Sequence, residues 1–592
     1  MGVSLASALS FCFLPALAAL PRTTEPGSVT LSPERRLVFK NKFVPFALLA
    51  LSQGVFAQQP PSAGSQIQQI PPSPTPQKAA PALRIEPSTT PATPASDAAK
   101  ITVNRLQVTG VRVFPEAELL ALTGFKPGSE LSLGDLRAMA LAITQRYRSA
   151  GYFVAQAYLP AQEIKDGAVT IAVIEGQYGK VTVRNQSNLS DNLVQSQLGG
   201  LNAGDTVAIA PLESRLLLLS DIPGVNVTST LAPGALPGTS DLIVDIAPGR
   251  RVTGSIDADN AGNRYTGEYR LGATVNLNNA AGRGDVASLR VLTSGSGLNY
   301  ARASYQMQFG KATAGVAYSW LGYELGREFS YTGATGTARI ASIYGSYPLI
   351  RSRNTNLYAG LAFDHKTFQD KNPIDLGMPV ADKKSQVLTA SLRGDHRDSL
   401  GGGGVSGYSL AWSAGNINLQ TPELQDRYAL AQTSGHFNKL GFSAMRLQSV
   451  TDSVSLYAGL NGQVASKNLD VSEKMELGGM YGVRAYPSGE AYADQGYVLT
   501  LEARLRLPTP DQFPGQMQLI GFIDTGSVTT HKNPWDAGDN RRTLSGAGVG
   551  LNWSDTNNFL VRAFYARKLG NEAATSAPDK SGRFWVQAVK YF

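Results

Sequence analysis

The sequence predicts two small α+β modules followed by a large all-β barrel that spans a membrane. Three observations predict this fold. Residues 251–592 form a series of short segments in which apolar and polar side chains alternate, with Gly, Asn and Asp between the segments. Residues 101–249 repeat one order of predicted elements twice. Near the N-terminus, a basic stretch precedes an apolar stretch, as in a secretory signal peptide.

The composition suits a sheet protein that has one face in lipid. Charged residues make up 17% of the chain, which is below the roughly 25% of soluble domains. The formal net charge is +8 without a run of Lys and Arg, so the sequence does not favour nucleic-acid binding. The single cysteine, Cys12, lies near the N-terminus, and the rest of the chain can form neither a disulfide scaffold nor a cysteine metal site.

Residues 1–57 are predicted to be a leader that contains the signal peptide. The basic stretch 35–42 precedes the apolar stretch Phe43–Leu51, and small residues occupy the −3 and −1 positions before Gln58. We therefore predict cleavage between Ala57 and Gln58.

Two translation starts are compatible with this leader. An earlier apolar stretch, Val3–Leu20, has no basic residue before it, which a signal peptide requires. Either translation starts near Leu37 or Val38, or the chain carries one long leader.

Residues 58–100 are rich in Pro, Ser, Gln and Ala. Proline cannot donate a hydrogen bond to a strand and holds the chain extended. We predict a semi-rigid, disordered linker over this range.

The two modules share the order strand, helix, helix, strand, strand. In residues 101–177, the expected elements are a strand at 101–108, a helix at 115–122, a helix that begins after Ser132, and strands at 154–159 and 168–174. In residues 178–249, they are a strand at 180–184, helices at 191–198 and from about Pro211, and strands at 225–227 and 242–246. One small module therefore occurs twice in tandem.

The alternation in residues 251–592 is clear in the segment Leu499–Leu507. Its odd-numbered positions are Leu or Ala, and its even-numbered positions are Thr500, Glu502, Arg504 and Arg506. This is the pattern of a transmembrane strand with its apolar face in lipid. Charges on the inward face require a wet environment, so we expect a water-filled or loop-plugged lumen.

A soluble β-sandwich would show the same alternation. Three features favour the barrel: the leader, the length of the region without a helical break, and a final strand, Arg583–Phe592, that ends in an aromatic residue. We predict that Phe592 is a signal for barrel assembly. No apolar run after residue 60 is long enough for a transmembrane helix, so a membrane-spanning chain must close its sheet.

Three motifs occur in order along the barrel region. The first comprises Asp257–Gly262, Thr266, Gly267 and Asn278–Asp285. The second is Glu476–Tyr486, which ends in Val483, Arg484, Ala485 and Tyr486. The third is Gly521–Gly526, with Phe522, Asp524 and Gly526 in the pattern Phe-x-Asp-x-Gly.

With the tandem modules, these motifs resemble those of the two-partner secretion transporters, or hemolysin secretion/activation proteins, over roughly residues 101–592. The resemblance implies two POTRA domains, 101–177 and 178–249, and a barrel of about 16 antiparallel strands at 251–592. In that family, the first motif forms the first barrel hairpin, the second lies in the sixth extracellular loop, and the third lies on a strand.

The resemblance also implies a contact inside the lumen. The loop that carries Arg484 would fold back into the barrel, where the guanidinium pairs with the Asp524 carboxylate. The alternative is two unrelated solvated charges. Ala485 stands where the family usually has Gly, and it would strain the turn by roughly 1 kcal/mol if this position needs a positive φ.

The function implied by the resemblance is protein secretion across the outer membrane of a Gram-negative bacterium. The POTRA domains would recognise a large exoprotein in the periplasm, and the barrel pore would secrete it; the exoprotein would be an adhesin, a cytolysin or a contact-dependent toxin. Further partners would be outer-membrane lipids and the barrel-assembly machinery, and the chain would act as a monomer. The family often has a plug helix in the pore, but Pro-rich residues occupy that place here, and Ser65–Ile70 offers under two turns.

We expect no enzymatic activity, no metal and no cofactor. A Gly-x-Ser-x-Gly motif is absent, and the Gly401–Gly404 run lacks the Lys of a phosphate loop. The four histidines show no metal-ligand spacing: His365, His396, His436 and His531. Two other classes stay open, an insertase that assembles outer-membrane proteins and, less compatible with two modules, a porin or surface receptor.

Overall fold

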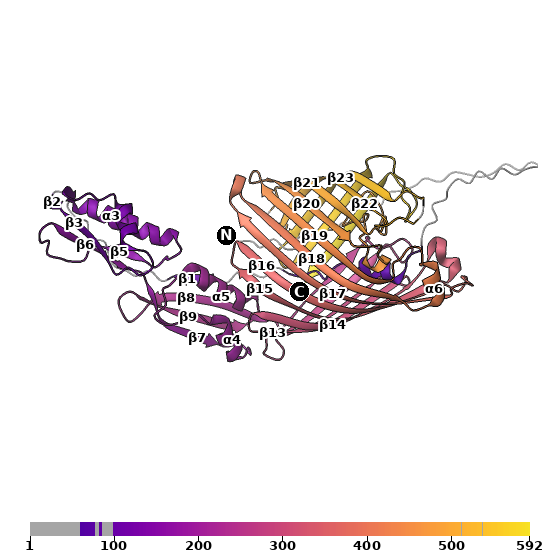
Figure 1. Cartoon of the computed structure of the whole chain (residues 1–592), viewed down its shortest axis with the longest axis horizontal. Coiled ribbons are helices and arrows are strands. Elements are labelled where there is room, and N and C mark those ends of the chain that lie inside the picture. The colour runs from indigo at the N-terminus through magenta and orange to yellow at the C-terminus, as the bar shows by residue number, and fades with distance from the viewer. Residues whose placement is uncertain (1–59, 77–81, 86–98, 511, 536) are drawn as a thin grey trace, which may run out of the picture.

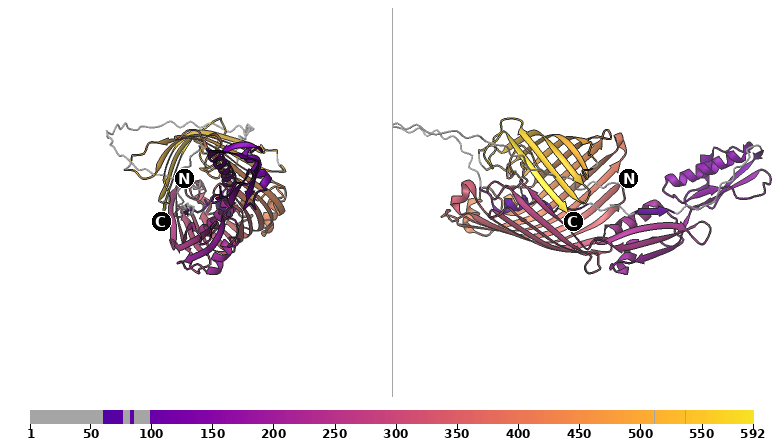
Figure 2. Two further views of the ribbon diagram at one scale, coloured as in Figure 1. Left: turned by 90° about the vertical axis from the view of Figure 1, so that its left-hand side faces the viewer. Right: turned by 180° about the vertical axis from the view of Figure 1, so that it is seen from behind.

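The computed structural model describes residues 60–76, 82–85, 99–510, 512–535 and 537–592. The predicted leader, 1–57, and the predicted cleavage site at Ala57 and Gln58 lie outside the described residues. The described chain forms a barrel with two α/β modules that project from one end (Figures 1 and 2). None of the helices in these ranges is both long and apolar enough to cross a membrane.

Sixteen antiparallel strands close into one barrel, in which each strand pairs with its neighbours in sequence and the last pairs with the first. This confirms the predicted barrel. The strands are β10 (Val252–Asp259), β11 (Arg270–Asn278), β12 (Val286–Thr293), β13 (Leu298–Phe309), β14 (Ala312–Glu324), β15 (Thr335–Arg351), β16 (Thr355–Lys371), β17 (Val380–Asp398), β18 (Gly404–Leu419), β19 (Gly435–Ser449), β20 (Val454–Ala465), β21 (Gln495–Leu507), β22 (Gln516–Thr529), β23 (Arg541–Asp555), β24 (Phe559–Lys568) and β25 (Gly582–Tyr591).

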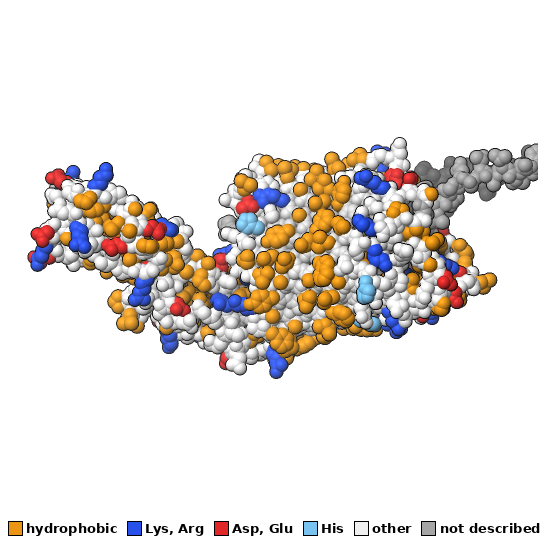
Figure 3. All heavy atoms as spheres, in the orientation of Figure 1, with side chains coloured by type: hydrophobic (Ala, Val, Ile, Leu, Met, Phe, Trp, Pro, Cys, Tyr) orange, Lys and Arg blue, Asp and Glu red, His pale blue; other side chains and the backbone are white. Residues whose placement is uncertain are grey.

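The predicted alternation sorts side chains between the two faces of the barrel. On β21, Leu501 is 46% exposed on the outer face, whereas the next residue, Glu502, is 8% exposed and faces the lumen. Figure 3 shows the outward apolar side chains as a belt across the face of the barrel that it presents. Lys590 lies on the outer face of β25, and its ammonium donates to Asn558 at the end of the barrel next to the modules.

The first module is a three-stranded sheet with two helices packed on it. The sheet order is β3 (Arg105–Thr109), β6 (Ala168–Ile174), β5 (Gln156–Tyr158), and the helices are α2 (Glu116–Thr123) and α3 (Leu133–Ser149). The predicted strand at 101–108 is split into two strands, β2 (Lys100–Val103) and β3, and β2 pairs with a further short strand, β4 (Ser129–Ser132).

Helix α3 begins where the sequence predicts. Ser132 and Asp135 form a capping box, and the hydrogen bonds from Ser132 lower the pKa of the Asp135 carboxyl. Ile143 and Tyr147 are fully buried on the face that meets the sheet. The Tyr147 hydroxyl donates to Glu175 over 2.8 Å, so this buried carboxylate ties the helix to the end of β6.

The second module repeats the order around its own core. Its sheet contains β7 (Gln177–Asn185), β9 (Thr239–Pro248) and β8 (Val225–Pro233), and its helices are α4 (Asp191–Leu198) and α5 (Ile209–Asp221). Burial raises the pKa of Tyr178 to about 12. This module also contacts the barrel, since Arg351 of β15 binds Asp221 over 2.7 Å.

The prediction of a disordered linker at 58–100 is wrong for the described part of that range. Residues Ala63–Gln68 form a short helix, α1, inside the barrel, and Ala82–Ile85 form a strand, β1, that pairs in parallel with β8. The prolines flank the helix, where Ser62 caps its start. The Pro-rich composition therefore limits the helix to under two turns, as predicted, without preventing it from occupying the lumen.

A charge placed on the outer face of β21 tests this assignment of faces. We expect Leu501→Lys to destabilise the barrel by about 2–4 kcal/mol, because the ammonium would lie in hydrocarbon at mid-strand. Urea unfolding of the protein in lipid vesicles measures the change, with Leu501→Ile as the control. A Lys variant as stable as the Ile variant would show that this position is not in lipid.

Candidate functional site

The loop between β20 and β21, residues 466–494, folds back into the lumen, and we call it the lumen loop. Its central apolar residues are buried, with Leu477, Val483 and Tyr486 each 0% exposed. They pack against Phe522 of β22 and Trp585 of β25. The loop is therefore packed against the barrel wall.

Arg484 lies at the centre of this contact and meets Asp524 of β22. The guanidinium binds the carboxylate through two parallel contacts, Nε to Oδ2 and Nη2 to Oδ1, each 2.8 Å long, and the Arg484 backbone N–H donates to Oδ2 over 3.1 Å. A second carboxylate, that of Glu502 on β21, lies 2.9 Å from Nη1 of Arg484. Arg484 is 4% exposed and Asp524 is fully buried, so water screens little of their attraction.

Aromatic rings enclose the same guanidinium. Its central carbon lies 3.5 Å from the centre of the Phe522 ring and 4.9 Å from that of Phe564. The Trp585 indole N–H donates to the Arg484 carbonyl over 2.7 Å. Strands β22, β24 and β25 therefore all hold the tip of the lumen loop.

Two glycines, Gly526 of the third motif and Gly546 of β23, allow the loop and the wall to come close. A Cβ on Gly526 would lie 2.4 Å from Leu477, and a Cβ on Gly546 would lie 2.4 Å from that of Ala485. Ala485 is not among the non-glycine residues with positive φ, so it does not strain the turn. Tyr486 donates to the Glu572 carbonyl over 3.1 Å, in the loop before β25.

The rest of the lumen loop is held by ion pairs that motif reasoning missed. Acidic loop residues meet basic residues on the inward faces of the strands. The pairs are Asp470 with Lys383 at 2.8 Å, Glu473 with Lys366 at 2.7 Å and with Lys439 at 2.9 Å, and Glu490 with Arg542 at 2.6 Å. The signal in the sequence was the placement of Lys at inward positions of strands that face an acidic loop.

Helix α1 fills the lumen beside the loop. The Ala63 backbone N–H donates to Asp370 of β16 over 2.7 Å, and Arg270 of β11 donates to the Gln69 carbonyl over 2.8 Å. On the loop side, Gln69 donates to the Tyr492 hydroxyl over 2.6 Å. Gly64 packs against Ser472, where a Cβ would lie 2.9 Å away. The lumen therefore holds two segments that contact each other and the wall.

Phe592 closes the barrel seam. Its backbone N–H donates to the Gly254 carbonyl over 3.1 Å, and the Gly254 N–H donates to the Phe592 carbonyl over 3.0 Å. The phenyl ring covers Gly254, where a Cβ would lie 2.4 Å from the ring. The last residue thus extends the pairing of β25 with β10.

Within the described ranges, no three His, Cys, Asp or Glu side chains converge as a set of metal ligands. A closed barrel with two α/β modules at one end and a polar, filled lumen defines an outer-membrane transport protein.

Comparison with known proteins agrees with this class. The model of the haemolysin secretion/activation protein family, ShlB/FhaC/HecB, matches residues 238–553, and that of the ShlB-type POTRA domain matches residues 101–176. The heme/hemopexin transporter protein HuxB of Haemophilus influenzae is 33% identical over 476 residues, which cover 78% of this chain and 82% of HuxB. The outer membrane transporter CdiB of Dickeya dadantii is 24% identical over 418 residues, 68% of this chain and 71% of CdiB.

Two solved structures share the fold. CdiB from Escherichia coli has a TM-score of 0.65 at 21% identity and covers 85% of this chain and 93% of its own. CdiB from Acinetobacter baumannii has a TM-score of 0.57 at 20% identity, with 89% and 96% covered. The chain belongs to the haemolysin secretion/activation protein family, ShlB/FhaC/HecB. It is a two-partner secretion transporter of the outer membrane, and its POTRA domains lie in the periplasm.

Removing the carboxylate of Asp524 should release the lumen loop. We expect Asp524→Asn to destabilise the packed loop by about 3–5 kcal/mol, because Arg484 stays buried without its main partner. Limited proteolysis of the loop in detergent measures the release. The control is Asp375→Asn, which removes an exposed pair with Arg427 and should change stability by about 0–1 kcal/mol. Equal protease resistance of both variants would contradict the anchoring role.

Replacing α1 should open the pore. We expect a variant with Gly and Ser in place of residues 63–70 to conduct ions more than the natural chain, because the apolar and polar contacts of the helix with the wall are lost. Conductance in planar lipid bilayers is the measurement. The same replacement at residues 422–429, which include α6 (Pro422–Arg427) in a loop beyond the strands, is the control. Unchanged conductance in the first variant would show that the lumen loop alone closes the pore.

Proposed function

We propose that the POTRA domains capture a large exoprotein in the periplasm and that this exoprotein crosses the outer membrane through the barrel. The observation that supports this proposal most is how the lumen is closed. Helix α1 and the lumen loop are held there by hydrogen bonds, ion pairs and packing. Both segments can therefore leave without breaking the sheet, and the polar wall they uncover suits an extended polypeptide.

The arrangement of sheet edges supports capture by the first module. Strands β5 and β8 are each the fourth element in the repeated order strand, helix, helix, strand, strand. Each pairs with the strand that follows it in sequence, β5 with β6 and β8 with β9. Strand β8 is covered by β1, whereas β5 borders no further strand in the described residues. We propose that an extended segment of the exoprotein adds to β5, where main-chain hydrogen bonds would bind it.

A polar pore of this kind suits large secreted proteins as a class. An adhesin, a cytolysin and a contact-dependent toxin are all large secreted proteins that fit such a pore. HuxB, at 33% identity, is named for heme and hemopexin transport. We therefore add a protein that handles heme or hemopexin to the candidate exoproteins.

The remaining predictions belong to the same proposal. The chain acts as a monomer without a cofactor and without catalysing a reaction, and outer-membrane lipids surround its belt. The barrel-assembly machinery recognises the final strand with Phe592, and Arg484 with Asp524 positions the lumen loop that secretion requires. The domain boundaries are 101–177 and 178–249 for the POTRA domains and 251–592 for the barrel. The family match favours transport over the insertase alternative.

Secretion in a Gram-negative host tests this function. The chain is co-expressed with the large exoprotein encoded beside it, and the exoprotein is assayed in the medium. We expect secretion with the natural chain and a loss of about tenfold or more with Arg484→Ala, since one buried partner is missing. The control is Arg427→Gln, which removes an exposed cation outside the lumen.

Two outcomes would contradict the proposal. An exoprotein that reaches the medium equally well without the chain needs another transporter. An exoprotein that stays in the periplasm, together with misassembly of other outer-membrane barrels when the chain is deleted, would favour the insertase.

A further inference from the structure

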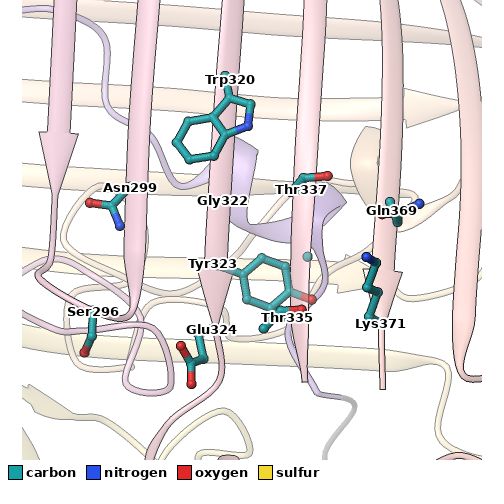
Figure 4. A pocket seen from close by; sticks show the side chains of 11 residues that line it. Ser296, Asn299, Trp320, Gly322, Tyr323, Glu324, Thr335, Thr337, Gln369 and Lys371 are labelled. Carbon is teal, nitrogen blue, oxygen red and sulfur yellow. The ribbon is translucent and has the colours of Figure 1, made fainter. Parts of the chain in front are cut away.

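The outer face of the barrel carries a polar hollow of about 280 Å³ next to the apolar belt. It lies over strands β13–β16 at the end of the barrel remote from the POTRA domains. Its lining includes Asn299, Trp320, Gly322, Thr337, Gln369 and Lys371. Figure 4 shows Trp320 at one end of the hollow, Glu324 and Ser296 at the other, and Lys371 at its flank.

The strand register shows that the polar groups of the hollow form one row. Asn299 pairs with Gly322, Gly322 with Thr337, and Thr337 with Gln369 across four neighbouring strands. Because side chains alternate along a strand, these residues share the outer face with Val316 and Tyr318. Val316 is 52% exposed and Tyr318 is 51% exposed, as expected in lipid.

Trp320 and Gly322 give the hollow its shape. The glycine leaves the floor without a side chain, and the indole lies against it, since a Cβ there would be 2.9 Å from Cη2 and Cζ2 of Trp320. Trp320 itself is 38% exposed. An exposed ring beside amide and hydroxyl groups is a surface on which a sugar ring can stack while its hydroxyls form hydrogen bonds.

Three cations surround this surface without carboxylate partners in the described residues. Arg339 pairs across the strands with both Trp320 and Thr367, and Thr367 pairs with Lys384. Arg339 and Lys384 therefore lie on one level, about 10 Å apart at two strand spacings. Arg339, Lys384 and Lys371 are exposed, and none of them forms an ion pair in these ranges.

Two acidic groups lie on the same outer face, and neither forms an ion pair with these cations in the described residues. Asp382 accepts a hydrogen bond from the Gln369 amide over 2.9 Å, and Glu324 lies in the row of Lys371, two strand spacings away. The other edge of the belt differs, because the outward Arg446 there is paired with Asp398 over 2.8 Å. Figure 3 shows Lys and Arg side chains beside the apolar belt on the side away from the POTRA domains. Three cations against two carboxylates thus leave a net positive charge at the level of the outer leaflet.

We propose that this hollow binds the headgroup of a phosphorylated glycolipid of the outer leaflet. Trp320 stacks on a sugar ring, Asn299, Thr337 and Gln369 bind its hydroxyls, and Arg339, Lys384 and Lys371 bind its phosphates. The acyl chains lie along the apolar belt below. The site depends on the outer-membrane location and not on the proposed secretion of an exoprotein.

Binding of lipid A to the purified full chain in detergent tests this site. Native mass spectrometry follows titrations with lipid A that carries both phosphates, with its dephosphorylated form, and with inorganic phosphate. We expect the double variant Arg339→Gln, Lys384→Gln to bind the phosphorylated lipid about tenfold more weakly and the dephosphorylated lipid unchanged. Trp320→Ala should weaken binding of both lipids, because stacking does not depend on phosphate.

The matched control is Arg567→Gln, which removes an exposed outward cation at the same end of β24, away from the hollow. Its lipid binding should equal that of the natural chain. Equal weakening by Arg567→Gln, or unchanged binding in the double variant, would overturn the proposal in favour of general attraction to the belt. Displacement of the lipid by inorganic phosphate alone would reduce the site to an anion site. Heat-dependent migration on gels checks that each variant has a folded barrel.

Discussion

The bidentate contact between Arg484 and Asp524 is the interaction on which the arrangement of the lumen depends. It joins the tip of a long loop to the middle of β22 and sits where water cannot replace either partner. The pair is placed by glycines, because Gly526 and Gly546 leave the room that the loop backbone needs. Once the tip is held, the acidic residues nearer the ends of the loop reach the basic residues on the wall, and α1 can pack against the loop.

Much of the fold could be predicted because it depends on local pattern. Alternation assigns each strand residue to lipid or lumen, as with Leu501 and Glu502. Helix α3 begins at Ser132 because a capping box is a short-range signal. The motif residues Arg484 and Asp524 were predicted to meet because a family resemblance adds information about contacts between distant residues. No local pattern in the sequence carries that information.

The rest depends on contacts between distant segments, and the sequence shows these poorly. The pairs of Lys366 and Lys383 with the lumen loop need the strand register, which periodicity alone does not give. The Pro-rich residues around α1 predicted a disordered linker with under two turns of helix at Ser65–Ile70, but the few apolar residues of α1 bury against a wall that only the closed barrel provides. The hollow at Trp320 likewise appears only when four strands are aligned.

The chain between α1 and β1 tethers the helix in the lumen to the second POTRA domain. Helix α1 ends at Gln68 and β1 begins at Ala82, so the connecting chain can span at most about 50 Å. While β1 stays on the edge of β8, a helix that leaves the lumen remains near the mouth of the pore at a high effective concentration, of the order of millimolar. Rebinding is then an intramolecular event, and the pore can reseal after each passage without a second component.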